Sequence, residues 1–257
     1  SPGVSPVAIS RVPGRRRTPG PPEPGVAADG PRAHPPDMQS RWPTALIFGQ
    51  ALLAALRDSD ETEALLTGEE ISSVGRMRAL VPLLEAQPSG RAILRERPRL
   101  TSETVDLEAL RRLPDDTLGH AYAAHLERCG LDLDALSVPV TRGPDALSNY
   151  LLERVRQTHD VWHTLLGLGT EGHQEVLVHA FQWPQLRMPY SALVVFFGTL
   201  KHLVGEARWV ALRRHLPAAY HAGRAAAPLL AVHWERHWDE PLDALRRRLG
   251  VRPAPAW

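Results

Sequence analysis

Apolar residues recur at helical spacing along most of the chain. Residues 44–58, TALIFGQALLAALRD, place Leu46, Leu52, Leu53 and Leu56 on one helical face. Further segments with this spacing predict helices at residues 74–86, 107–130 (two short helices broken at Pro114), 147–166, 171–181, 190–203, 209–238 and 240–250. No segment shows the alternating pattern of a β-strand. The pattern therefore predicts an all-α fold, a single multi-helix domain over residues 42–251 followed by a flexible tail, residues 252–257.

The N-terminal segment differs in composition. Residues 1–41 are rich in proline and glycine and have almost no large apolar side chains, so we predict that they are disordered. A secretory signal would need an apolar run of about 7–15 residues, which is absent here. A mitochondrial presequence is disfavoured by the prolines, which oppose an amphipathic helix. A start of translation at Met38 is the third interpretation.

Composition excludes several classes of protein. The 257 residues are 43% hydrophobic and 23% charged, with a formal net charge of +1, so no overall field attracts nucleic acid or an anionic membrane. The single cysteine, Cys129, excludes an intrachain disulfide. The apolar segment Tyr190–Leu203 has 11 residues before Lys201, short of the ~20 that a spanning helix needs. We expect a buried core helix there; a wall of a lipid cavity and an interfacial helix are the alternatives.

Two histidines four residues apart form a candidate metal site. His159 and His163 lie on one helical face, where both imidazoles can reach one cation, and Asp160 follows the first of them. The spacing alone is weak, because a chain with 12 histidines produces such pairs by chance. A second pair, His233 and His237, is interpreted as a partly exposed helix face.

A helical hairpin strengthens this candidate. The turn at residues 167–170 joins two predicted antiparallel helices, and Glu175 follows the turn by about as much as His163 precedes it. His159, His163, Glu175 and Asp160 would then meet between facing helices, where helical proteins build metal sites. Two nitrogens with carboxylates suit zinc or iron and leave a position open. The alternative for Glu175 is a solvated acid at a helix N-terminus.

The ordered motifs resemble the coenzyme Q (ubiquinone) biosynthesis protein 4 family. The gapped arrangement His-Asp-x-x-His, eleven residues, then Glu is similar to the metal motif of that family. LRRLPDDTLGHAYAAHL, TLLGLG, FQWPQLRMP, YHAGRAA and HWERHWDEPLDALRRRLGV resemble its other segments, in the same order. Asp116 stands where the family usually has glycine, Leu186 and Arg187 replace a Thr-Gly pair, and His125 replaces an aromatic residue.

This resemblance implies a function. It implies metal-dependent oxidative decarboxylation at ring carbon 1 of a polyprenylated hydroxybenzoate, a lyase of the 4-hydroxy-3-methoxy-5-polyprenylbenzoate decarboxylase type. It also implies peripheral attachment to the membrane surface and association with other ubiquinone-biosynthesis enzymes, with a homodimer among the expectations. We expect His159, Asp160, His163 and Glu175 to bind Zn²⁺, or Fe²⁺ in its place. Nucleic acid is not an expected partner.

Residue roles and rival functions complete the expectations. Asp160 is expected to be a further ligand or a base acting through water. Arg224 is expected to steer the carboxylate or phenolate, with a structural role at a helix C-terminus as the alternative. Leu193, Val194, Val195, Phe196 and Phe197 would wall the lipid cavity. Rival interpretations are a non-catalytic lipid-binding scaffold that organises the enzyme complex, and an HD-type phosphohydrolase, which lacks its further ligands here. We expect a location in the bacterial cytoplasm at the inner membrane, with the matrix side of the mitochondrial inner membrane as the alternative.

Overall fold

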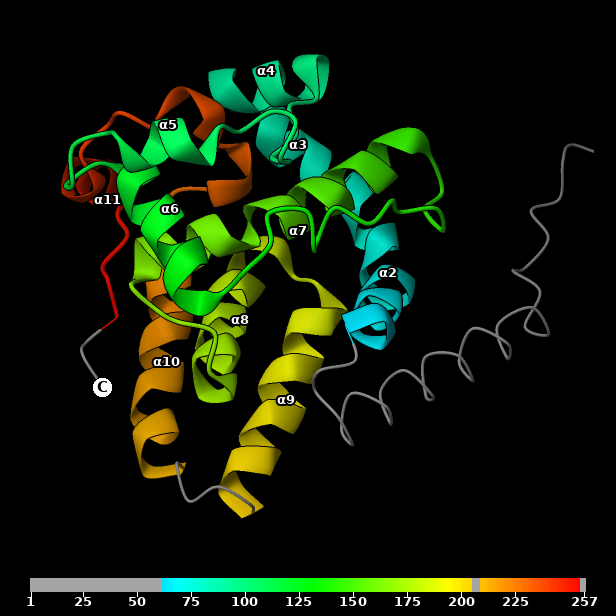
Figure 1. Ribbon diagram of the computed structural model, residues 1–257. Helices are drawn as coiled ribbons and strands as arrows, with labels where there is room; N and C mark the ends of the chain where they lie inside the picture. The colour runs from blue at the N-terminus through cyan, green and yellow to red at the C-terminus, as the bar shows by residue number, and fades with distance from the viewer. Residues whose placement is uncertain (1–61, 205–208, 255–257) are drawn as a thin grey trace, which may run out of the picture. The chain divides into compact units, whose positions relative to one another are not determined.

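The computed structural model describes residues 62–204 and 209–254, and these contain helices and loops with no β-strand (Figure 1). The predictions for residues 1–41 and for a helix at residues 44–58 lie outside the described residues, as does part of the predicted tail. The helices are α2 (Thr62–Met77), α3 (Val81–Glu85), α4 (Pro88–Glu96), α5 (Leu107–Arg111), α6 (Leu118–Cys129), α7 (Ala146–Leu166), α8 (Gly172–Leu186), α9 (Pro189–Val204), α10 (Trp209–Ala225) and α11 (Leu242–Leu249). The all-α prediction is confirmed for these residues.

Helix α7 forms the centre of the described fold, and both of its ends are set by local sequence. Asp145 caps its N-terminus by accepting a hydrogen bond from the Ser148 backbone N–H. Gly167 ends the helix in the left-handed conformation at φ +68°, which a glycine adopts without steric cost. Most side chains of α7 are buried, because α2, α6 and α8 pack around it.

Two ion pairs that involve buried arginines of α7 hold this helix to its neighbours. The fully buried Arg154 guanidinium pairs with Glu235, and Arg156 donates from Nε to Glu69 on α2 at 2.7 Å. Removing one partner of such a buried pair costs more than forming it gains, because an unpaired charge is left without water. The two arginines therefore fix the position of α7, and with it the position of the histidines that α7 carries.

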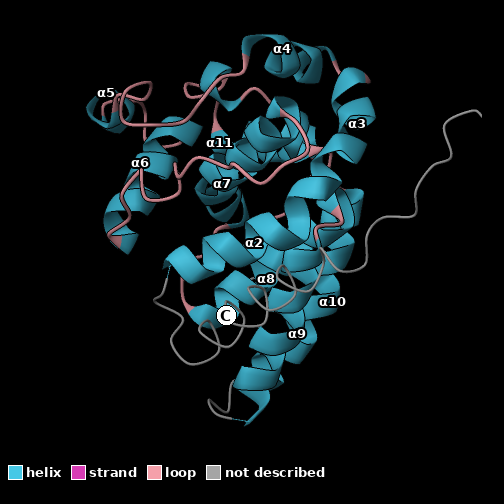
Figure 2. Cartoon of the chain, turned by 90° about the vertical axis from the view of Figure 1, so that its right-hand side faces the viewer, coloured by secondary structure: helices cyan, strands magenta, loops and turns pink. Residues whose placement is uncertain are grey.

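Helices α9 and α10 pack against α8, one on each side of it (Figure 1). Gly223 of α10 and Gly198 of α9 make these contacts close. A Cβ at Gly223 would lie 2.0 Å from the Phe181 carbonyl oxygen, and one at Gly198 would lie 2.3 Å from Val176 Cγ2. Figure 2 shows the same helices from the side, below α2 and α7.

Several predicted boundaries were wrong. Helix α8 continues past the expected break at residue 183 because Pro184 sits in its last turn, so only one interior hydrogen bond is lost. The predicted helix 209–238 ends at Ala225, and Leu229–Ala231 and Trp234–Arg236 form 3₁₀ turns. The prediction of a partly exposed helix face at HWERH is therefore wrong as to the helix, while the segment is partly exposed: Arg236 is exposed, and His233 is buried, with Nε2 3.1 Å from Glu96 Oε2. Helix α4 was not predicted.

The prediction of a buried helix at residues 190–203 is only half right. Helix α9 forms there, and Ser191 and His202 are buried, but Phe196, Leu200 and Leu203 are 63%, 46% and 49% exposed. Among the described helices, none combines the length and the apolar character that crossing a bilayer requires. The break at Pro114 and the helix end at Gly130 are both confirmed.

Candidate metal centre

Three predicted ligands meet between α7 and α8. His159 and His163 come from the last two turns of α7, and Glu175 comes from the first turn of α8. His163 Nε2 lies 3.0 Å from His159 Nε2, and the Glu175 carboxylate lies 3.3 Å from His159 Nε2 and 3.4 Å from His163 Nε2. The hairpin turn brings the acid back to the level of the two imidazoles, as the residue spacing predicted.

These separations suit a tetrahedral metal ion. Donors about 2.0–2.1 Å from zinc at the corners of a tetrahedron lie about 3.3–3.4 Å from one another. The two imidazole nitrogens lie 3.0 Å apart, and each lies near that edge length from one oxygen of Glu175, His159 Nε2 at 3.3 Å from Oε2 and His163 Nε2 at 3.4 Å from Oε1. Two imidazole nitrogens and a carboxylate oxygen are also a donor set that zinc and iron accept, and three protein ligands leave one tetrahedral position for another ligand.

The orientation of His163 is fixed by the turn that follows it. Its side chain is fully buried, and Nδ1 lies 3.0 Å from the Gly169 carbonyl oxygen, so Nδ1–H donates to that carbonyl. The proton on Nδ1 leaves the lone pair on Nε2, the nitrogen that faces His159 and Glu175. A backbone carbonyl that holds the far ring nitrogen of a histidine is a common feature of metal sites.

Electrostatics couple the three side chains. Burial alone would raise the pKa of Glu175, but the charges and hydrogen bonds of His163 and His159 hold it well below its usual value. Burial alone would lower the pKa of His159, but the hydrogen bond and the charge of Glu175 raise it. Glu175 is therefore ionised, and the ionised carboxylate is the form that binds a cation.

Asp160 lies beside the cluster without joining its three ligand atoms. Its carboxyl group is largely buried, and burial raises its pKa against the opposing charges of His159 and His163. A carboxyl group with a raised pKa is better suited to exchange a proton near neutral pH than an ordinary aspartate is. This placement favours the predicted role as a base over the predicted role as a ligand.

Two further histidines surround the cluster and were not predicted as site residues. The His125 ring stacks on His163 at 5.6 Å between centroids, and the His179 ring lies 5.4 Å from His159. Burial lowers the pKa of His125 to about 4 and that of His179 to about 3, so both are neutral near pH 7. His179 follows Glu175 by four residues on α8, a spacing that could have indicated it. The sequence marks His125, on α6, only as a departure from the family pattern, and gives no signal that it lies near the site.

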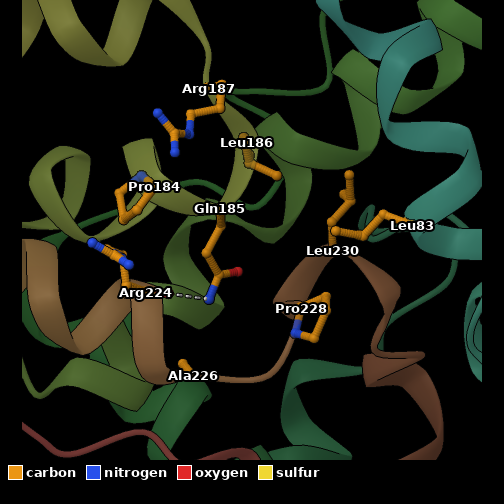
Figure 3. A pocket seen from close by; sticks show the side chains of 10 residues that line it. Leu83, Pro184, Gln185, Leu186, Arg187, Arg224, Ala226, Pro228 and Leu230 are labelled. Carbon is orange, nitrogen blue, oxygen red and sulfur yellow. Dashed lines mark hydrogen bonds between the residues drawn. The ribbon is translucent and has the colours of Figure 1, made fainter.

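Arg224 is not brought to this cluster. It lines a separate cavity of about 240 Å³ near the end of α8, together with Pro184, Gln185 and Arg187 (Figure 3). Gln185 lies ten residues after Glu175, about 15 Å along the helix at 1.5 Å per residue. That distance exceeds the reach of an arginine side chain. The expectation that Arg224 steers a group bound at the metal centre is therefore not supported by the geometry.

Gln185, which lines this cavity, has a structural role. Its side-chain N–H groups donate to the carbonyl oxygens of Gly223 and Ala227, each at 3.1 Å, and its Oε1 accepts from the Leu229 N–H at 3.0 Å. These bonds connect the end of α8 to the end of α10 and the chain that follows it. Arg224 lies at the end of α10, where a structural role at a helix C-terminus was the stated alternative.

The fold and the site define a class: helical proteins with a candidate His₂-carboxylate metal site between two antiparallel helices. A model of the family "Coenzyme Q (ubiquinone) biosynthesis protein Coq4" matches residues 37–255. The chain belongs to this family, as the motif order predicted, and the family functions in ubiquinone biosynthesis.

Curated relatives and a solved structure agree with this assignment. The ubiquinone biosynthesis protein COQ4 of Coprinopsis cinerea is 34% identical over 82% of this chain and 72% of its own length. Its Xenopus laevis homologue is 33% identical over 82% and 73%. A crystal structure of a candidate ubiquinone biosynthesis protein from Nostoc punctiforme is 27% identical, with a TM-score of 0.65 over 81% of this chain and 97% of that one.

The predicted location needs correction. The relatives from Coprinopsis cinerea, Xenopus laevis and Mus musculus are all named as mitochondrial proteins. The prediction of a bacterial cytoplasmic protein, which rested on the absence of a convincing import signal in residues 1–41, is therefore wrong.

Proposed function

We propose that this chain catalyses the metal-dependent oxidative decarboxylation of a polyprenylated hydroxybenzoate in ubiquinone biosynthesis. In this reaction ring carbon 1 loses its carboxyl group as carbon dioxide and gains a hydroxyl group. The change is a net two-electron oxidation: water supplies the hydroxyl group, and molecular oxygen accepts two electrons and two protons and leaves as hydrogen peroxide. The observation that carries the proposal is the cluster of His159, His163 and Glu175, because its donor atoms and their separations suit a catalytic metal ion with an open position.

We assign a different role to each group of residues at the site. His159, His163 and Glu175 would hold the metal ion, with Zn²⁺ proposed and Fe²⁺ as the alternative. A bound metal ion supplies a Lewis acid that polarises a coordinated oxygen. Asp160 accepts or returns a proton beside the site, which its raised pKa favours. His125 and His179, neutral and buried, add no charge and keep bulk water away from the two ligand histidines.

The setting of the reaction follows from the family. A polyprenylated substrate resides in a membrane, so we propose that the chain works at a membrane surface alongside other ubiquinone-biosynthesis enzymes. The names of the relatives support a mitochondrial location for this chain. The rival function, a lipid-binding scaffold without catalysis, predicts binding of the lipid with no turnover.

The metal test compares two histidine variants. His163→Ala should lose most of the bound metal measured by mass spectrometry of the purified protein. His221→Ala removes an exposed histidine of α10 and should retain the wild-type metal content. His163→Ala should also fail to restore ubiquinone in a deficient strain. Equal metal content in the two variants would overturn the proposed site.

The catalytic test uses the metal-loaded protein. Incubation with the prenylated hydroxybenzoate and oxygen should release carbon dioxide and form the ring-hydroxylated product. The same preparation in the absence of oxygen should form none. Binding of the lipid without product in the presence of oxygen would overturn the enzymatic function in favour of the scaffold.

A further inference from the structure

Helix α9 exposes a stripe of large apolar side chains. Phe196, Leu200 and Leu203 occur at spacings of four and three residues, which places them on one face of the helix. Val138 is the other large hydrophobic residue that is well exposed in the described ranges, so most of this exposure is gathered on one helix. A concentrated apolar face on a soluble domain marks a contact surface.

The helices that carry the stripe are cationic. The sequences of α9 and α10 contain Lys201, Arg213, Arg214 and Arg224 and no aspartate or glutamate. The whole chain, in contrast, has 30 basic and 29 acidic residues. Lys201, Arg213 and Arg214 are exposed. Lys201 is therefore on the helix that carries the stripe, and Arg213 and Arg214 are in the first two turns of α10, the next helix along the chain, although the chain as a whole is nearly neutral.

The position of α9 connects this surface to the metal centre. Its first residues lie beside the site, since the Tyr190 ring contacts the His179 ring at 5.5 Å between centroids. Its other end, with Leu200 and Leu203, extends past α2 and α7 in both views (Figures 1 and 2). A surface held at this end would lie one helix length from the metal centre.

We propose that the stripe Phe196, Leu200 and Leu203, with the cationic residues of α9 and α10, docks the protein on an anionic lipid bilayer. The apolar side chains enter the boundary between head groups and acyl chains, and the exposed Lys201, Arg213 and Arg214 meet the negative head groups. This inference rests on the proposed function at a membrane surface and names the part of the chain responsible. A second copy of the chain on the same stripe is the competing occupant.

Vesicle co-sedimentation tests the surface without metal or catalysis. The purified full chain should bind phosphatidylcholine vesicles that contain phosphatidylglycerol and should bind pure phosphatidylcholine much less. Leu200→Ser should weaken the partition about three- to tenfold, because about half of this side chain is exposed and full burial of a leucine contributes about 1.5–3 kcal/mol. Val138→Ser is the matched control, because both residues are 46% exposed, and it should leave binding unchanged.

A second pair of variants tests the charges. Arg213→Gln combined with Arg214→Gln should weaken binding about 25-fold, at about fivefold for each arginine near the bilayer. Arg247→Gln combined with Arg252→Gln removes two exposed arginines elsewhere and should have little effect. Circular dichroism would confirm that all variants are folded.

Three results would overturn the docking surface. They are equal binding to neutral and anionic vesicles, equal losses in Leu200→Ser and Val138→Ser, and a dimer in light scattering that Leu200→Ser dissociates while vesicle binding is absent. Loss of metal from His163→Ala is independent of these outcomes. A failure of the docking surface is therefore distinguishable from a failure of the proposed catalytic site.

Discussion

Arg187 is an arginine in a backbone conformation that favours glycine. It ends α8 at φ +54° and ψ +34°, where its N–H donates to the Trp183 carbonyl oxygen at 2.8 Å. In the left-handed region the Cβ of any residue except glycine crowds the following carbonyl, at a cost of roughly 1–2 kcal/mol. Members of the Coq4 family usually have glycine at this position. Because glycine adopts this conformation without strain, Arg187→Gly should stabilise this protein.

The magnitude follows from two opposing terms. Relief of the left-handed strain gains roughly 1–2 kcal/mol, and the greater freedom of glycine in the unfolded chain returns roughly 0.5–1 kcal/mol. The net gain is about 0.5–1 kcal/mol, which would raise the melting temperature by about 1–4 °C for a domain of this size. The Arg187 side chain is exposed, and among the described residues its guanidinium has no hydrogen bond or ion pair to lose.

Thermal unfolding of two control variants makes the test specific. Arg187→Ala keeps the Cβ and should change the melting temperature little. Arg214→Gly is the same substitution at an exposed position inside α10, where glycine should cost about 1 kcal/mol. Opposite signs for the two Arg→Gly variants are expected. A melting temperature that falls equally in both would refute the assignment of strain to Arg187.

Two further predictions concern packing and pH. Gly223→Ala should destabilise the fold by about 2 kcal/mol or more in urea unfolding, because its Cβ would meet the Phe181 carbonyl oxygen at 2.0 Å. Gly75→Ala, with nothing within 4 Å of its Cβ, should stabilise the fold by about 0.5–1 kcal/mol. Equal effects of the two substitutions would contradict the close contact at Gly223. Burial lowers the pKa of His125 to about 4 in the folded chain. Below about pH 6.5 the His125 imidazole therefore binds a proton in the unfolded chain but not in the folded chain, so stability should fall as the pH drops from 6.5 towards 4. His125→Phe should remove roughly 1–2 kcal/mol of the loss between pH 7 and 5, and an unchanged pH dependence would show that His125 is not the group responsible.

Local sequence was sufficient for the elements with clear ends. Asp145 and Gly167 define α7, and Pro114 and Gly130 separate and end the helices before it, because caps and breaks depend on residues next to them in the chain. The ends that failed depend on distant contacts. HWERH has helical spacing, but His233 is buried against Glu96, and this contact between distant parts of the chain replaces the predicted helix with a 3₁₀ turn.

The same division applies to the site. His159, His163 and Glu175 could be predicted from sequence because the helix repeat and a short turn fix their relative positions within 17 consecutive residues. Arg224 could not be placed, because its distance from the site depends on how α10 crosses α8. The role predicted for Arg224 rested on its residue type. Residue type indicates what a side chain can bind but does not indicate where the side chain lies in the fold.

The sequence by itself determined the helical class, the family and the spacing of the three candidate metal ligands, since each depends on periodicity, on motif order or on short-range geometry. The tertiary structure decided which other side chains surround those three residues, that Arg224 lines a cavity away from them, and that one face of α9 is exposed. Hydrophobic spacing marks residues that can be buried, but the area available for burial is set by the neighbouring helices. Leu200 and Leu203 have the pattern of core residues, yet among the described helices none covers them.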